Sequence, residues 1–469
     1  MALFKISVVG LFSALAVLTD ALERPLSDFE ALQHLGANSP WFPGPNVNHI
    51  SSEVPGGCKV DQAVYVVRHG SRYPDPGAYQ QWADLHEKIQ SAKFTARGEL
   101  SFLSSWEPVL KHPSQQVSQV SPTGYQELYD LGVELQTRYP DFYEYNTPFL
   151  LWSNDYQRTI DSARLFARGY LGPNSTLADV HVVNAKDASA VGNSLATSDS
   201  CPTFKDVSGG DYVDKWDSIY LPPIVKRLSK LIEGNLTLNA SDLSLFPYLC
   251  GFESQVTRRV SPFCSLFRPE EILQYEYRQD LRYYYGTGAG AFKNSSVMFP
   301  VLQGVVDLLS EGPGVVVKTS DGQSKPLPPL IVAFTHDNQI NELASILGVF
   351  DGQKPLPADR IDSDRIYVSS RVSPMRGTIT FERLNCTAGG HPHKPGQVGT
   401  SVRIRLNDAV YRLSCPIDQY AELVEKKFSQ QGTFASICGI PESNVTGSAS
   451  GGVTFFTDLT LPSIRTVKP

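Results

Sequence analysis

Three apolar runs in this chain each end in a cluster of polar side chains, and this pattern constrains the fold more than any other feature. Residues 63–67 lead into Arg-His-Gly-Ser-Arg-Tyr-Pro at 68–74, residues 149–152 lead into 153–159, and residues 330–334 lead into Thr-His-Asp-Asn at 335–338. Short apolar runs bounded by polar residues are typical of buried strands. In open α/β sheets, ligands bind beyond the carboxyl ends of the strands. The pattern therefore predicts an α/β fold in which three strand ends converge on one site.

The polar residues at these three ends have the chemistry of a phosphate site. The six residues concerned are Arg68, His69, Arg72, Arg158, His336 and Asp337. A guanidinium is a planar fork of donors that matches phosphate oxygens, and an imidazole between two such forks is placed to attack a bound phosphoryl group. One Arg-His pair alone is better explained as a charged loop after a buried strand. Three coincident strand ends favour the phosphate site.

The motif Arg-His-Gly-x-Arg-x-Pro at 68–74, with the distant pair His336-Asp337, resembles the signature of the histidine acid phosphatases. The resemblance is closest to the fungal secreted branch, which holds phytases and broad acid phosphatases, and it covers roughly residues 35–438. It implies a phosphoglycerate-mutase-like α/β domain with a central, mainly parallel sheet, plus an inserted, mostly helical domain.

The residue pattern agrees with this two-domain organisation. Residues 183–292 show helical periodicity and few strand-like runs, so we expect them to form the inserted helical domain, with residues 22–182 and 293–469 forming the α/β catalytic domain. The expected helices cover 80–89, 123–139, 159–170, 219–232, 269–285, 297–309 and 338–347, and further strands are expected at 378–384 and 401–406.

The N-terminus predicts secretion. Residues 1–21 contain Lys5, an apolar run over 6–18 and small residues near the end, which is the pattern of a signal peptide. The run is too short to cross a bilayer comfortably, and no later segment is apolar enough, so we expect an extracellular protein without a membrane anchor. Six Asn-x-Ser/Thr sequons fit that route, at Asn174, Asn235, Asn239, Asn294, Asn385 and Asn444. The net charge is −7 and no basic run exceeds a pair, which argues against nucleic-acid binding.

Seven cysteines in a secreted chain predict three disulfides and one unpaired thiol, although the sequence alone does not give the pairing. The resemblance implies the pairs Cys58–Cys386, Cys201–Cys438 and Cys250–Cys264, which leaves Cys415. A zinc site is the alternative, but no Cys-x-x-Cys occurs.

Two further motifs bear on whether the chain binds a cofactor or a metal. The glycines at 286, 288 and 290 are spaced as in a dinucleotide loop, but a helix precedes them where that motif needs a strand, so a loop that ends a helix is the better interpretation. His391 and His393 could suggest a metal, but no third ligand is evident. We therefore expect neither metal nor cofactor.

The residues suggest a mechanism for hydrolysis of a phosphate monoester. Phosphoryl transfer depends mainly on positioning and charge stabilisation, which Arg68, Arg72, Arg158 and His336 would supply without a metal. His69 is the expected nucleophile, because a phosphohistidine divides one difficult step into two easier ones. Asp337 is the expected general acid for the leaving alcohol and then the base for water.

The sequence favours a secreted phosphomonoesterase of broad specificity with possible phytase activity over a dedicated phytase. The stretch after the motif, 75–81, has one acid and no base; Arg282-Tyr283 stands where many phytase relatives show two lysines, and Ala37-Asn38 replaces a Gln-Tyr pair. A less basic rim should attract a polyanion such as phytate less strongly. A phosphotransferase or mutase and a non-catalytic glycoprotein of the same fold remain as less favoured classes.

Overall fold

The protein is built around an eight-stranded sheet, seen here in a computed structural model that describes residues 30–387 and 399–469. The strand order is β11-β10-β9-β1-β8-β3-β4-β12. Its four central strands are parallel: β1 (Cys58–Arg68), β8 (Leu330–Thr335), β3 (Phe149–Asn154) and β4 (Ala178–Val183). The predicted α/β fold with a central, mainly parallel sheet is confirmed. The expected signal peptide at 1–21 and the histidines at 391 and 393 lie outside the described residues.

Antiparallel strands extend both edges of the parallel centre. On one side β9 (Thr378–Cys386), β10 (Gly399–Leu406) and β11 (Ala409–Pro416) follow one another beside β1, and on the other side β12 (Ile464–Val467) pairs with β4. The sequence predicted β9 and β10 but neither β11 nor the β4–β12 pair. Both β4 and β12 are short and contain charged or polar residues, so their apolar pattern is weak.

Two cores cover the two faces of the sheet. Along β1, Val64 and Val66 belong to one core, whereas Ala63, Tyr65 and Val67 belong to the other. This alternation is the period of two expected for a strand. All six residues of β8 are buried, which matches a strand covered on both faces. The helices α3 (Pro122–Arg138) and α4 (Gln157–Leu171) contribute to one core, and α9 (Phe299–Glu311) and α10 (Asp337–Ile346) contribute to the other.

Six of the seven expected helices are present within a few residues of their expected bounds. They are α1 (Pro76–Ser91), α3 (Pro122–Arg138), α4 (Gln157–Leu171), α7 (Pro269–Gly286), α9 (Phe299–Glu311) and α10 (Asp337–Ile346). The seventh prediction, 219–232, is wrong at both ends: α5 runs over Gly210–Ser229, through two prolines, and Ile232–Gly234 forms strand β5, which pairs with β2 (Phe94–Ala96). The glycines at 286–290 end α7 and begin a 3-10 turn, as expected of a helix-terminating loop.

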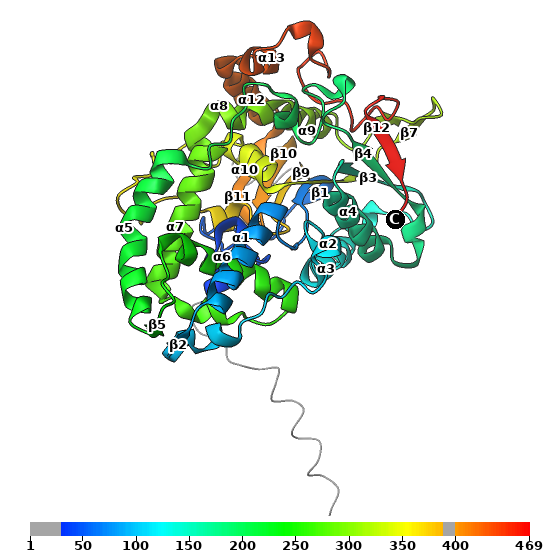
Figure 1. Cartoon of the computed structure of the whole chain (residues 1–469). Coiled ribbons are helices and arrows are strands. Elements are labelled where there is room, and N and C mark those ends of the chain that lie inside the picture. The colour runs from blue at the N-terminus through cyan, green and yellow to red at the C-terminus, as the bar shows by residue number, and fades with distance from the viewer. Residues whose placement is uncertain (1–29, 388–398) are drawn as a thin grey trace, which may run out of the picture.

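The stretch between β4 and α8 (Phe292–Ser295) is largely helical. Its helices α5, α6 (Ala240–Thr257) and α7 stand together on the left of Figure 1, with α1 next to α6 on the side towards the centre. The aromatic ring of Trp82 on α1 packs on Tyr248 and Phe252 of α6, so an earlier segment of the chain joins this group. The domain boundaries at 183 and 292 stay a prediction. The remaining elements are α2 (Pro113–Gln116), α11 (Ser369–Val372), α12 (Ile417–Gln431), α13 (Phe434–Cys438), β6 (Val316–Lys318) and β7 (Ser324–Pro326).

The structure contains the three disulfides that the resemblance implied, Cys58–Cys386, Cys201–Cys438 and Cys250–Cys264, and Cys415 is free. Cys58 and Cys386 are directly opposite each other in the β1–β9 pair. No helix within the described residues is long and apolar enough to cross a membrane.

The six sequon asparagines differ in their surroundings. Asn235, Asn239, Asn385 and Asn444 are exposed, and Asn174 is half-buried. Asn294 is half-buried as well, and its Nδ2 donates to the carbonyl oxygens of Lys205 and Gly286 at 2.7 and 2.8 Å. A glycan on Nδ2 would remove one of these donors, so Asn294 suits glycosylation least. Occupancy of the sequons stays a prediction.

Two of the disulfides close loops of very different length, which predicts that their removal lowers the free energy of unfolding by unequal amounts. Cys58–Cys386 spans 328 residues of sequence and Cys250–Cys264 spans 14. The chain-entropy relation gives about 6 kcal/mol for the long loop and about 3 kcal/mol for the short one. The double variant Cys58→Ala/Cys386→Ala should therefore lose more free energy of unfolding than Cys250→Ala/Cys264→Ala, measured by denaturant titration. Equal losses would contradict this account.

Candidate active site

Hydrogen bonds to the helices α3 and α4 fix the loop that follows β1. Ser71 donates through its backbone N–H and its hydroxyl to the Glu127 carboxylate on α3, at 2.7 and 2.8 Å, and the N–H of Gly70 donates to Ser162 on α4 at 3.2 Å. The loop and α3 approach so closely that a Cβ on Gly124 would lie 2.1 Å from the Ser71 carbonyl oxygen. Glycine is therefore required at Gly124, and the loop cannot shift without moving α3.

The three predicted strand ends do meet. Arg68, the last residue of β1, lies opposite Thr335 at the end of β8, and β3 is the next strand along. The chain then continues from β3 into α4, and from β8 into α10, with His336 as the N-cap of α10. Two helix N-termini consequently begin at this edge of the sheet, where their free N–H groups favour an anion.

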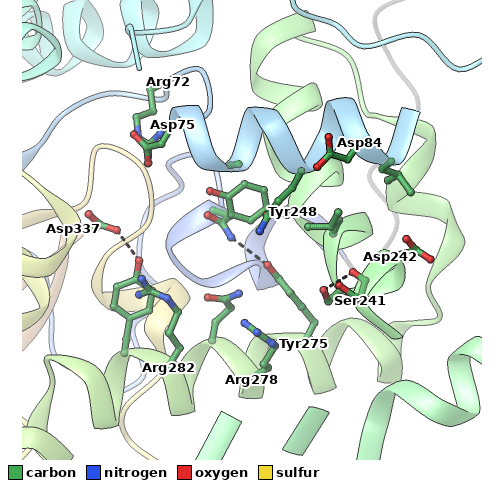
Figure 2. A pocket seen from close by; sticks show the side chains of 18 of the residues that line it. Arg72, Asp75, Asp84, Ser241, Asp242, Tyr248, Tyr275, Arg278, Arg282 and Asp337 are labelled. Atoms are coloured by element: carbon green, nitrogen blue, oxygen red, sulfur yellow. Dashed lines mark hydrogen bonds and ion pairs between the residues drawn. The ribbon is translucent and has the colours of Figure 1, made fainter. Parts of the chain in front are cut away.

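A cavity of about 800 Å³ opens at this edge, between the sheet and the helices α1, α6 and α7 (Figure 2). Arg68, Arg72, Arg158 and Asp337 line it. His69 and His336 are buried beside them, 1% and 9% exposed, with ring centroids 5.5 Å apart. All six residues predicted from the sequence therefore belong to one cluster.

Several hydrogen-bond donors of this cluster have no partner among the described residues. They are the Nε atoms of Arg68, Arg72 and Arg158 and the one protonated ring nitrogen of His336, neither of whose ring nitrogens has a partner there. Buried donors are normally satisfied, and each unpaired one costs stability. Several together around one cavity form a site built for an anion with several oxygens, such as a phosphoryl group.

Other atoms of the same guanidiniums are anchored by the protein. Nη1 of Arg68 donates to the carbonyl oxygens of Ala37 and Ser373 at 2.6 and 2.9 Å. Nη2 of Arg72 pairs with Asp75 at 2.8 Å. These bonds set the orientation of the forks before any ligand binds, which reduces the cost of ordering them.

The imidazole of His69 is held in the form that a nucleophile needs. Its Nδ1 lies 2.9 Å from the carbonyl oxygen of Gly70, which can only accept, so Nδ1 carries the proton and Nε2 keeps its lone pair. Burial, together with the charges of Arg158, Arg68 and Arg72, lowers the pKa of His69 well below its usual value. The ring therefore stays neutral under acidic conditions in which a free histidine would be protonated.

The pKa of Asp337 is lowered as well, which favours the ionised carboxylate. Burial alone would raise its pKa, but Arg68, 3.7 Å away, and a hydrogen bond from Tyr283 outweigh burial and hold the pKa well below its usual range. Bound phosphate would add negative charge beside the carboxyl and raise this pKa.

On the helical side of the cavity, the sequence pointed to residues 75–81 and to Arg282-Tyr283 as parts of the rim, but not to the other charged residues there. Lys88 on α1, Asp242 on α6, and Arg278 and Arg282 on α7 also line it. Together with Tyr275, the two arginines recur at helical spacing on one face of α7. That spacing is a usable signal, but periodicity does not say whether a polar face of a helix meets solvent or a cavity.

Within the described residues, no three His, Cys, Asp or Glu side chains are grouped so as to hold a metal ion.

Comparison with known families identifies this constellation. The model of the histidine phosphatase superfamily (branch 2) matches residues 59–407, which include all six site residues. The chain belongs to this superfamily. The predicted enzyme class, a histidine phosphatase, is thereby confirmed.

This histidine phosphatase has relatives named phytases and relatives named acid phosphatases. It is 27% identical to phytase PHO112 of Candida albicans, covering 89% of each chain, and 28% identical to acid phosphatase PHO1 of Komagataella pastoris, covering 90% of this chain and 89% of that one. The crystal structure of the phytase from D. castellii has the same fold, with a TM-score of 0.78 and 23% identity over 96% of this chain and 94% of that one.

A buried carboxyl near the site of this histidine phosphatase predicts that stability falls as pH rises. Glu342 on α10 is 0% exposed; burial, with Asp199 and Asp206 nearby, raises its pKa well above the usual value. Above the pKa of the unfolded chain, about 4.3, the unfolded state releases this proton while the folded state keeps it, which costs roughly 1 kcal/mol per pH unit. In Glu342→Gln, the free energy of unfolding should fall less between pH 4 and pH 7.

The matched control is Glu425→Gln, the same change at an exposed site on α12. Between pH 4 and pH 7, the free energy of unfolding of this variant should change as much as that of the wild type. An unchanged pH dependence in Glu342→Gln, measured by denaturant titration at several pH values, would contradict the assignment.

Proposed function

We propose that this protein is a secreted acid phosphatase that hydrolyses phosphate monoesters through a phosphohistidine on His69. The observation that carries the proposal is a set of buried donors from Arg68, Arg72, Arg158 and His336 beside His69 that have no partner in the part of the chain the structure describes. The names of the relatives, acid phosphatase and phytase, agree with this chemistry.

The first step transfers the phosphoryl group. The three arginines and His336 bind the phosphate oxygens, and Nε2 of His69 attacks phosphorus while the bond to the leaving oxygen breaks. The leaving oxygen takes the proton of Asp337 and departs as an alcohol. In the second step, Asp337 accepts a proton from water, the water oxygen attacks phosphorus, and the bond to His69 breaks to release inorganic phosphate.

The electrostatics of the site favour acidic conditions. His69 has a pKa well below its usual value, so it remains an unprotonated nucleophile at low pH. Asp337 must be protonated for the first step, and its low pKa makes that form scarce near neutrality. Activity should therefore decline as the pH rises.

We further propose that the enzyme prefers small monoesters to phytate. We call Arg68, Arg72, Arg158 and His336 the phosphate cradle. The cations beyond it are neutralised by carboxylates: Lys88 by Asp242 at 2.6 Å, Arg278 by Asp217 at 2.9 Å and Arg282 by Asp206 at 3.9 Å. Within the cradle, Asp75 pairs with Arg72. A rim of paired charges gives a polyanion little extra attraction. A dedicated phytase is the second candidate, since several relatives carry that name.

Secretion is supported by the signal-peptide pattern at 1–21, by the sequons and by three disulfides, which form in oxidising compartments.

The proposed mechanism predicts that His69→Ala loses at least about 10³-fold in kcat, because the covalent intermediate cannot form. Rapid alkaline quenching with ³²P-labelled substrate should place the label on His69 in the wild type, because the P–N bond of a phosphohistidine is stable in alkali and labile in acid. The control is His112→Ala, which removes an exposed imidazole at the start of α2, away from the cavity. Wild-type turnover by His69→Ala would refute the mechanism.

The paired charges around the cavity predict which substrate has the higher kcat/KM, and they indicate a substitution that should change this preference. The wild-type kcat/KM should be higher for a small alkyl or aryl monoester than for phytate at acid pH. Asp217→Asn leaves the charge of Arg278 unbalanced and should raise kcat/KM for phytate about threefold to tenfold, with less than a twofold change for the small monoester.

Asp214→Asn provides the control, because it removes an exposed carboxylate one turn away on the same helix. It should change the ratio of the two substrates less than Asp217→Asn does. A wild-type kcat/KM for phytate more than tenfold above that for the small monoester would overturn the proposed preference and favour a dedicated phytase.

A further inference from the structure

We propose that Tyr283 is a positioning residue that orients Asp337 and sets the upper pH limit of the first catalytic step. This inference rests on the proposed function, because it assigns Tyr283 a role through the general acid of that reaction. Nothing in the motif 68–74 or in the His-Asp pair points to a tyrosine on α7.

The contact between the two residues is direct. The phenol of Tyr283 donates to Oδ2 of Asp337 at 2.6 Å, the dashed line beside Asp337 in Figure 2. Tyr283 is 4% exposed, whereas the Asp337 side chain is 25% exposed and faces the cavity. Because Oδ2 already accepts this bond, Oδ1 is the oxygen left to carry the acid proton. The phenol thus selects which oxygen protonates the leaving group.

Tyr283 is itself held by one contact on its ring and one on its backbone. The guanidinium of Arg282 lies over it, 4.3 Å from the ring centroid, and Arg282 also pairs with Asp206. The backbone carbonyl of Tyr283 accepts from Nδ2 of Asn341, at 3.0 Å, one turn after Asp337 on α10. The phenol and the carboxyl are therefore held against each other by α7 and α10 together.

The same bond affects the protonation of the carboxyl. The charged and titratable groups that act on Asp337 are Arg68, Arg72, Arg158, Tyr248, Arg282, Tyr283, His336 and Glu342. The arginines keep their charge throughout the acid range, so they do not change with pH. A donor to a carboxylate stabilises the ionised form. Removing the phenol should raise the pKa of Asp337 and preserve the acid form to a higher pH.

The test compares Tyr283→Phe with the wild type, using kcat/KM against pH for an alkyl phosphate and for nitrophenyl phosphate. This constant contains only the steps up to departure of the leaving group. With the alkyl phosphate, the alkaline limb of the profile of kcat/KM against pH should lie about one pH unit higher in Tyr283→Phe than in the wild type. With nitrophenyl phosphate it should not move, because nitrophenolate leaves without a proton.

The matched control is Tyr284→Phe, one residue further along α7, where the phenol lies 3.5 Å from the Lys354 carbonyl oxygen and does not touch Asp337. Its alkaline limb should coincide with that of the wild type on both substrates. An unchanged limb in Tyr283→Phe, an equal shift on the two substrates, or a similar shift in Tyr284→Phe would each overturn the inference.

A further variant separates this inference from the proposed function. Asp337→Asn should lose about 10²- to 10⁴-fold with the alkyl phosphate and less with nitrophenyl phosphate. Equal losses on both substrates would reject Asp337 as the general acid and with it the proposed mechanism. Unequal losses in Asp337→Asn with an unchanged limb in Tyr283→Phe would reject only the role of Tyr283.

Discussion

The accumulation of positive charge at one edge of the sheet is the constraint on which this structure depends. Arg68, Arg72 and Arg158 converge there, and buried like charges repel one another strongly. The protein meets that cost with rigid anchors, namely the carbonyl oxygens of Ala37 and Ser373 and the carboxylate of Asp75. Buried N–H groups remain unpartnered within the described chain, so the site retains the capacity to bind an anion.

The same arginines shift the pKa values of the two groups proposed to be catalytic in useful directions. They lower the pKa of His69, which keeps the proposed nucleophile neutral, and they lower the pKa of Asp337, which makes its acid form dependent on low pH or on bound phosphate. Pairs of titratable groups tuned by one environment are a common basis of acid–base catalysis. In this site a single cluster of cations acts on both.

The cavity has two walls with different tasks. The sheet edge carries the residues proposed to bind and transfer phosphate, while α1, α6 and α7 line the rest of the cavity and pair their own cations with carboxylates. The bond from Tyr283 to Asp337 connects these walls, because its donor lies on α7 and its acceptor on α10. The position of the helical wall can therefore influence the chemistry as well as the choice of substrate.

The sequence by itself determined the sheet centre and the phosphate cradle. A strand buried on both faces must be apolar almost throughout, so β1, β3 and β8 stood out, and the residues at their carboxyl ends had to meet if the strands were parallel neighbours. Only the tertiary structure decided strand β4 and the edge strands β11 and β12. It also decided the contacts of Tyr283, Arg278 and Lys88, because helical periodicity shows that residues share a face and cannot show what that face meets.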